Sequence, residues 1–282
     1  MSSVRRSTGG FTLVELLVVV VIGALILGAT YQVLAVQERS YRQQSAVINT
    51  QQTMRDAVAV LESELREISP GGGDLLMMTP DSLRFRAYRA AGFICSFDEA
   101  GQRIAVQEVP GVMPGGNTAF RAGDSLLYFI EGLRQTGADD AWGSVLISTP
   151  PPDPNGSCGS WGGGAGTILN VPGFPFSSGA VLVGAPVRSF QVLTYGLYDV
   201  GGEPMLARHT ATGSLVPVIG PLAPSGQGPV FRYFDANGNP TTNPGLVARI
   251  EIVVRGRTEG TGVPGQTHYS DSLVTQLFLR NN

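Results

Sequence analysis

One carboxylate occupies a position where a charged side chain is unusual. Glu15 lies near the start of the apolar segment FTLVELLVVVVIG, and residues 16–37 that follow it carry no charge. A carboxylate in a membrane helix is costly unless it reaches the interface or meets a cation. Cleavage after Gly10 would create such a cation, because the new α-amino group of Phe11 would lie one helical turn from Glu15. The residues therefore predict either an interfacial Glu15 or a processing site coupled to a charge pair.

A second group of oxygen-bearing side chains lies in the segment DANGN. Asp235, Asn237 and Asn239 alternate there, as ligands do in a calcium-binding loop. An EF-hand also needs a glycine after the third ligand and an acid at position twelve, where this chain has Pro240 and Leu246. The sequence therefore favours a tight turn between two strands, with a calcium site as the alternative.

The other candidates for chemistry do not combine into a site. His209 and His268 lack cysteine or acidic neighbours at metal-ligand spacing. Asp139 and Asp140 are adjacent, so on an extended chain their side chains point apart. The glycines within 162–166 are not followed by Lys and Ser at P-loop spacing, and no G-x-S-x-G elbow supplies a nucleophile. We expect a protein that is not an enzyme and has no cofactor.

Charge and cysteine content narrow the possible partners. The chain has 282 residues, a net charge of -3 and no basic stripe interleaved with aromatic residues, so we expect no nucleic-acid partner. Cys95 and Cys158 are its two cysteines. In an oxidising compartment they can form one disulfide, and two unpaired thiols are the alternative.

The uncharged segment is long enough to be a membrane anchor. Residues 16–37, at about 1.5 Å per residue, span a hydrocarbon core of roughly 30 Å. The segment is longer than the apolar region of a typical signal peptide, and no A-x-A-like cleavage site ends it. Because Arg5 and Arg6 precede it and most of the chain follows, the positive-inside rule places Met1 in the cytoplasm and the large domain outside.

The helical pattern continues beyond Val36 and becomes amphipathic. One stripe recurs with alternating spacings of four and three, at Val47, Gln51, Met54, Val58, Leu61, Leu65 and Ile68. We predict a single helix from Phe11 to about Ile68, on the order of 85 Å long. Pro70 and the glycines after it would end the helix. Its outer half is expected to pack on the chain's own β-sheet, with a coiled coil as the alternative.

The rest of the chain is rich in turn residues and predicts antiparallel β-structure. The whole sequence contains 38 glycines and 19 prolines, and short apolar runs alternate with turn residues after residue 70. The segment from Thr149 to Pro175, with Cys158 and Trp161, is interpreted as a long loop. Strands are predicted at Ser82–Tyr88, Arg103–Val109, Ser125–Glu131, Ser144–Ser148, Val181–Val183, Val187–Leu197, Val230–Phe234, Leu246–Val254 and Ser272–Leu279.

Taken together, these segments predict an α+β fold, in which a long N-terminal helix packs on a mostly antiparallel β domain. The expected organisation is a leader at 1–10, a transmembrane half-helix at 11–36, an amphipathic half-helix at 37–69 and one globular domain at 70–282.

The N-terminal sequence GGFTLVELLVVVVIGALILG resembles the prepilin cleavage and methylation motif of type IV pilins and type II secretion pseudopilins. In that family a prepilin peptidase cuts after the glycine, here Gly10, and methylates the new first residue, here Phe11. The glutamate at the fifth mature position, here Glu15, pairs with the N-terminal amine of a neighbouring subunit. The resemblance implies a structural subunit whose partners are the peptidase, other pilin subunits and the inner membrane.

The resemblance beyond the N-terminus is one of layout. A long helix, a turn-rich β body, FRYFDANGNP and a final strand near SLVTQLFLRN are similar to J-type minor pseudopilins and PilW-like minor pilins. This implies a subunit of an initiation or tip complex whose globular domain is periplasmic or extracellular. Gln32 stands where major pilins often have a helix-breaking proline. The alternative is a single-pass, membrane-anchored binding domain that is not incorporated in a filament.

Overall fold

The computed structural model describes residues 11–111, 119–132, 137, 139–159, 164–176, 179, 181–209, 213–224, 230–258 and 270–279. The chain divides into two compact units. One comprises residues 1–51 and 258–269, and the other comprises residues 52–257 and 270–282.

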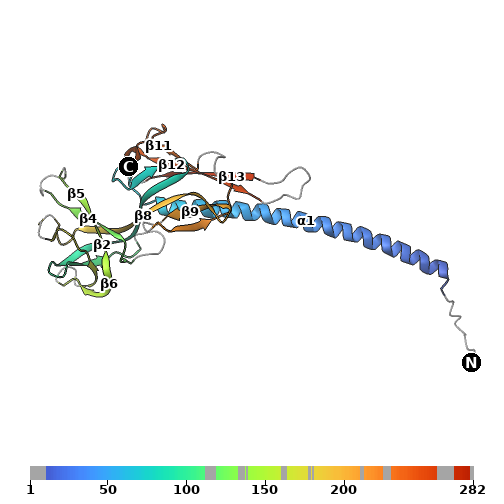
Figure 1. Ribbon diagram of the computed structural model, residues 1–282, viewed down its shortest axis with the longest axis horizontal. Helices are drawn as coiled ribbons and strands as arrows, with labels where there is room; N and C mark the ends of the chain where they lie inside the picture. The colour runs from blue at the N-terminus through green and yellow to red at the C-terminus, as the bar shows by residue number, and fades with distance from the viewer. Residues whose placement is uncertain are drawn as a thin grey trace, which may run out of the picture. The chain divides into compact units, whose positions relative to one another are not determined.

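A single helix, α1 (Leu13–Leu65), covers nearly all of the segment predicted to be helical (Figure 1). Thr12 caps its start, because the Thr12 Oγ1 accepts a hydrogen bond from the backbone N–H of Glu15 at 3.2 Å. The helix ends three residues before the predicted Ile68, and Pro70 follows in a turn. The expected single long helix is therefore confirmed.

The second unit contains one large antiparallel sheet. Its ten strands run in the order β10-β9-β8-β2-β3-β7-β6, while β1 pairs with β2, and β4 pairs with both β8 and β5. The strands are β1 (Leu75–Met78), β2 (Ser82–Asp98), β3 (Arg103–Glu108), β4 (Ser125–Ile130), β5 (Ala141–Leu146), β6 (Ser148–Ser157), β7 (Ala165–Asn170), β8 (Pro186–Val200), β9 (Glu203–His209) and β10 (Leu215–Ile219).

A smaller antiparallel sheet completes this unit. It consists of β11 (Phe231–Phe234), β12 (Arg249–Arg257) and β13 (Ser270–Phe278), with the short 3-10 helix η2 (Pro244–Leu246) before β12. Together with α1, the two sheets confirm the predicted α+β fold with a mostly antiparallel β body.

The end of α1 packs between strands of both sheets. Met54, Leu61 and Leu65 are buried in one apolar cluster with Phe85 of β2 and Ile250 of β12. The stripe from Met54 to Ile68 therefore packs against the chain's own sheets, as predicted. At roughly 1.5–3 kcal/mol for each fully buried aliphatic side chain, this stripe is a major anchor between the helix and the β body.

A second apolar cluster packs against the other half of the large sheet. β2 contributes side chains to both clusters, and one bulge makes this possible. Leu83 and Phe85 of β2 belong to the first cluster, whereas Ala90 and Ile94 belong to the second. Side chains alternate between the two faces of a strand, so an odd-numbered and an even-numbered set of residues can face the same side only if one extra residue lies between them. The register shift between Tyr88 and Ala90 supplies it at Arg89.

Two predictions about the β body are wrong. Val181–Val183 is not a strand; Val181 is buried in the second cluster, so its apolar run reflects core packing at a turn. The predicted loop Thr149–Pro175 contains β6 and β7. Prolines are tolerated in β6 because it is the terminal strand of the sheet, where one row of backbone N–H groups needs no partner strand.

The remaining differences concern strand boundaries and strands that the sequence did not reveal. β2 extends ten residues beyond the predicted Tyr88, and β12 begins at Arg249 because Leu246 lies in η2. The strands β1, β9 and β10 were not predicted. β9 carries polar and apolar residues without regular alternation, and β10 is a short edge strand.

Candidate functional site

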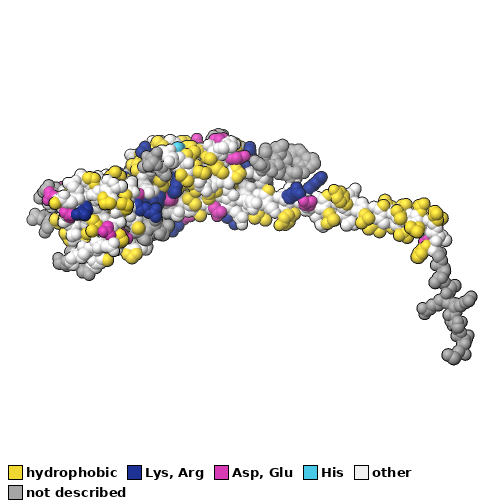
Figure 2. Space-filling model, turned by 60° about the horizontal axis from the view of Figure 1, so that its bottom comes forward, with side chains coloured by type: hydrophobic (Ala, Val, Ile, Leu, Met, Phe, Trp, Pro, Cys, Tyr) yellow, Lys and Arg dark blue, Asp and Glu magenta, His cyan; other side chains and the backbone are white. Residues whose placement is uncertain are grey.

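The first unit presents an exposed apolar helix surface. From Leu13 to Val36 the large side chains of α1 are mostly more than half exposed, for example Leu25 at 70% and Leu27 at 72%. Figure 2 shows hydrophobic side chains along this end of the helix. The polar hydroxyl of Thr30 donates a hydrogen bond to the Ile26 carbonyl oxygen at 2.8 Å, so it is satisfied within the helix. By length and composition this part of α1 can cross a membrane.

Glu15 lies in the first turn of this surface. Its backbone N–H donates a hydrogen bond to Thr12 Oγ1, and the residue is exposed. Within the described part of the chain, which starts at Phe11, no cation pairs with this carboxylate. Gly10 lies outside the described residues. The exposed helix thus carries one acid in its first turn and is otherwise uncharged up to Glu38, which forms an ion pair with Arg42.

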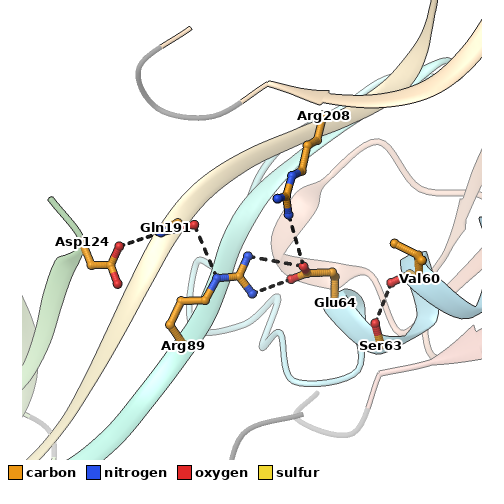
Figure 3. A network of polar contacts seen from close by, with 7 residues as sticks. All are labelled: Val60, Ser63, Glu64, Arg89, Asp124, Gln191 and Arg208. Carbon is orange, nitrogen blue, oxygen red and sulfur yellow. Dashed lines mark hydrogen bonds and ion pairs between the residues drawn. The ribbon is translucent and has the colours of Figure 1, made fainter. Parts of the chain in front are cut away.

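A buried polar network fixes the end of α1 to the large sheet (Figure 3). The Arg89 guanidinium donates to both Glu64 carboxylate oxygens, at 2.9 and 3.3 Å. The side chains of Glu64 and Arg89 are only 16% and 12% exposed. Arg208 of β9 approaches Glu64 at 3.9 Å. Leu83, Phe85 and Ala87 of β2 face the same cluster as the end of α1, and Arg89 continues this alternation to the side on which it meets the helix.

The network continues across the sheet to a buried aspartate. Gln191 of β8 accepts from Arg89 at 3.4 Å and donates to Asp124 at 2.7 Å. Burial raises the pKa of Asp124, while the hydrogen bond from Gln191 and the nearby Arg89 oppose this shift. The second carboxylate oxygen of Asp124 is buried without a hydrogen-bond partner among the residues that the structure describes.

The raised pKa of Asp124 predicts a pH dependence that asparagine should abolish. A raised native pKa means that folding is favoured while the carboxyl is protonated, and that this advantage is lost as the pH rises through the native pKa. Asp124→Asn keeps an oxygen that can accept from Gln191 but does not ionise. We therefore expect the stability of the variant relative to wild type to increase as pH rises above the ordinary range for aspartate.

Denaturant unfolding of the full chain in neutral detergent between acid and neutral pH would measure this difference. The matched control is Asp199→Asn, which removes an exposed carboxylate at the end of β8 that accepts a hydrogen bond from the Gly202 backbone N–H. A relative stability of Asp124→Asn that falls with increasing pH would contradict the assignment.

A second aspartate organises the turn after α1. Asp74 accepts hydrogen bonds from the backbone N–H of Ser69 at 2.8 Å and from the hydroxyl of Tyr88 at 2.7 Å. Burial raises the pKa of both Asp74 and Tyr88. Because these bonds join the chain leaving the helix to β2, we interpret Asp74 as a structural residue.

Cys95 and Cys158 form a disulfide. Cys95 lies in β2 and Cys158 directly follows β6, and their Cα atoms are 5.0 Å apart. Both residues are buried. The covalent bond attaches the proline-containing edge hairpin to the centre of the sheet. It belongs to the scaffold and offers no reactive thiol.

The candidate calcium ligands form a turn. The Asp235 carboxylate accepts hydrogen bonds from the backbone N–H groups of Asn237 at 2.9 Å and Asn239 at 2.8 Å. These bonds lower the pKa of Asp235. Phe234 pairs with Pro240 across the turn. The structure therefore confirms the predicted tight turn, and its backbone uses the carboxylate that the calcium alternative required.

The other candidates from the sequence do not assemble with these residues. His209 ends β9 and packs its ring against Tyr198, with ring centroids 5.0 Å apart. Asp140 accepts a hydrogen bond from the backbone N–H of Gly132. Gly164 and Gly166 flank the start of β7, whereas His268 and Trp161 lie outside the described residues. Within the described ranges no three or more histidine, cysteine or acidic side chains form a metal-binding group.

Comparison with known families identifies the N-terminal segment. Residues 5–31 match the family model of the prokaryotic N-terminal methylation motif, a segment that includes Gly10, Phe11 and Glu15. This motif is typical of type IV pilins and pseudopilins, and the long apolar helix fits it. No curated protein and no solved structure matches the chain. The motif and the apolar helix are consistent with membrane anchoring of a pilin-like precursor.

Proposed function

We propose that this chain, which carries the N-terminal methylation motif of type IV pilins and pseudopilins, is a structural filament subunit. A prepilin peptidase cuts after Gly10, removes residues 1–10 as a leader and methylates the new N-terminus on Phe11. The observation that carries this proposal is the match at residues 5–31, which covers the cleavage site and the acid one helical turn beyond it.

The exposed apolar surface of α1 provides the contact between subunits. In the membrane it faces lipid, and in a filament it packs against the same surface of neighbouring helices. The positive α-amino group of Phe11 pairs with Glu15 of a neighbouring subunit, which removes the cost of an unpaired carboxylate in an apolar environment. The peptidase carries out the processing reactions, and the chain itself acts as a structural subunit.

The proposed topology places the N-terminus inside and the β body outside. Arg5 and Arg6 remain on the cytoplasmic side of the inner membrane, and the domain of residues 70–282 is periplasmic or extracellular. A disulfide between Cys95 and Cys158 suits an oxidising compartment outside the cytoplasm.

The finer assignment is a minor subunit that initiates or caps the filament, in a type II secretion pseudopilus or a type IV pilus. The large β body supports this assignment. The three strands β11–β13 and the ten-stranded sheet make it bulkier than a single small sheet on a helix.

Filament isolation tests the proposal. Filaments sheared from cells that express the chain should contain it at low stoichiometry, detected by immunogold labelling at filament ends or by mass spectrometry. A chain that remains in the membrane fraction with residues 1–10 still attached would contradict the proposal and favour a single-pass anchored binding domain.

A further inference from the structure

A cavity in the second unit lies where two paired strands separate. Its volume is about 340 Å3, within the range of roughly 300–1,000 Å3 that is typical of ligand sites. Phe129 and Glu131 at the end of β4 form one wall, and residues 182–186 leading into β8 form the other. The pairing of β4 with β8 ends at Tyr128 and Val187, so the strands part there and leave the space open.

Both walls are held in place by contacts behind them. The backbone N–H of Gly184 donates to the Ile94 carbonyl oxygen at 2.7 Å, and the N–H of Ile94 donates to the Ala185 carbonyl oxygen at 3.0 Å. Gly184 has a φ of 93°, a conformation that favours glycine. Phe129 packs edge-on against its cross-strand partner Trp142, with ring centroids 5.5 Å apart. The cavity is therefore formed before any ligand arrives.

The chemistry of the lining is apolar and aromatic around one carboxylate. Phe129 and Glu131 are half-buried, and Val183 is 42% exposed at the opposite wall. Within the described ranges, Glu131 has no hydrogen bond or ion pair. A half-buried carboxylate without a partner is unfavourable, and it is relieved by a positive charge.

The aromatic wall favours the same ligand charge. The face of an aromatic ring attracts a cation, and the attraction is larger where water is displaced. Leu182 and Val183 can contact the methylene groups that carry a charged head. The Glu131 carboxylate would repel an anion, and a neutral ligand would leave the negative charge of Glu131 uncompensated.

We propose that this cavity binds an organic cation, namely a guanidinium or alkylammonium group. The Glu131 carboxylate pairs with the charged group of the ligand, and the face of the Phe129 ring contacts the same group. Trp142 acts as a positioning residue that holds the Phe129 ring. Such a group occurs on free small molecules and on the arginine and lysine side chains of a partner protein, and the probes below distinguish these sources. The site is independent of processing and of filament assembly.

Calorimetric titration of the full chain in neutral detergent tests the proposal. The probes are ethylguanidinium, the tripeptide acetyl-Gly-Arg-Gly-amide and its uncharged analogue with citrulline, all at constant ionic strength. We expect saturable binding of both cationic probes, with a Kd on the order of 1 mM, and at least tenfold weaker binding of the citrulline peptide. Binding of the tripeptide tenfold tighter than ethylguanidinium indicates a protein-borne side chain, whereas equal binding indicates that the free cation suffices.

Substitutions localise the binding. Glu131→Gln should weaken the binding of both cationic probes at least tenfold, and Phe129→Leu should weaken it several-fold. The matched control is Glu99→Gln, which removes an exposed carboxylate from the turn between β2 and β3 and should change nothing. Equal affinity in Glu131→Gln and wild type, equal binding of the citrulline peptide, or no saturable binding would each overturn the proposal.

The chain's own arginine at position 134 follows Glu131 closely in sequence and provides a further check. The variant Arg134→Ala should bind the cationic probes with the affinity of wild type. If binding occurs only in this variant, Arg134 is the cation that occupies the site, and a site for an external ligand is excluded.

Discussion

Replacing Glu15 with leucine leaves cleavage after Gly10 intact and reduces incorporation of the chain into filaments at least tenfold. Leucine makes insertion of α1 into the membrane easier, because it removes a carboxylate from an apolar helix. The same change leaves the α-amino group of a neighbouring Phe11 without its partner. Each 1.4 kcal/mol lost from that contact corresponds to a factor of ten in affinity. Comparison of processed protein in membranes with protein in sheared filaments measures both effects.

The matched control for Glu15 lies on the same helix. Glu38→Gln removes an exposed acid that pairs with Arg42 beyond the apolar segment, where water screens the charge. We expect this variant to be incorporated normally. Normal incorporation of Glu15→Leu as well would mean that the charge pair does not drive assembly.

Replacing Glu64 with alanine destabilises the second unit by about 3 kcal/mol. The substitution leaves the Arg89 guanidinium, whose side chain is 12% exposed, without its bidentate partner at the end of α1. Removing one member of a buried ion pair is expensive because the remaining charge stays desolvated. Denaturant unfolding of the full chain in neutral detergent, followed by near-ultraviolet circular dichroism, measures the loss.

Two further variants separate the cost of leaving Arg89 unpaired from two other quantities. These are the change in helix propensity and the net stabilisation by the Glu64–Arg89 ion pair. Glu62→Ala removes an acid from the same turn of α1 that pairs with Arg66 at the surface, and should cost less than about 1 kcal/mol. The double variant Glu64→Leu with Arg89→Met should recover part of the loss, since neither charge of the buried pair remains without its partner. Equal destabilisation by Glu62→Ala and Glu64→Ala would show that the network does not fix the helix.

The sequence predicted the helix well because its signals are local. The uncharged segment, the three- and four-residue spacing and the Pro70 stop each act within a few residues. The apolar stripe through Met54, Leu61 and Leu65 is buried as its periodicity predicts. The lack of charge therefore located the exposed apolar part of α1, and hydrophobic periodicity located the buried part.

The polar network was missed because its members are far apart in the chain. Glu64, Arg89 and Gln191 come from a helix and two strands, and they meet only because β2 pairs with β8 and the end of α1 packs against these strands. Neither the pairing register nor a bulge leaves a clear mark in a single sequence. Glu64 looks like an ordinary surface acid between Ser63 and Leu65 until the sheet is placed against it.

The β body shows the same limit. The prolines of β6 argued for a loop because a proline removes a donor from a ladder, but the position of β6 at the end of the sheet removes that objection. Residues 181–183 resembled a strand because a short apolar run in a turn, here with Val181 in the core and Val183 exposed, has the same composition as a short strand. Both outcomes depend on tertiary position, which local propensity does not contain.

The N-terminal mass of the purified protein shows whether the chain is cut after Gly10 and methylated on Phe11. Processing predicts a chain that begins at Phe11 and carries one methyl group on its α-amino nitrogen, so the mass falls by residues 1–10 and rises by one methyl group. The variant Gly10→Val should retain all of residues 1–10 without the methyl group. A wild-type protein that retains residues 1–10, or that begins at another residue, would contradict the account.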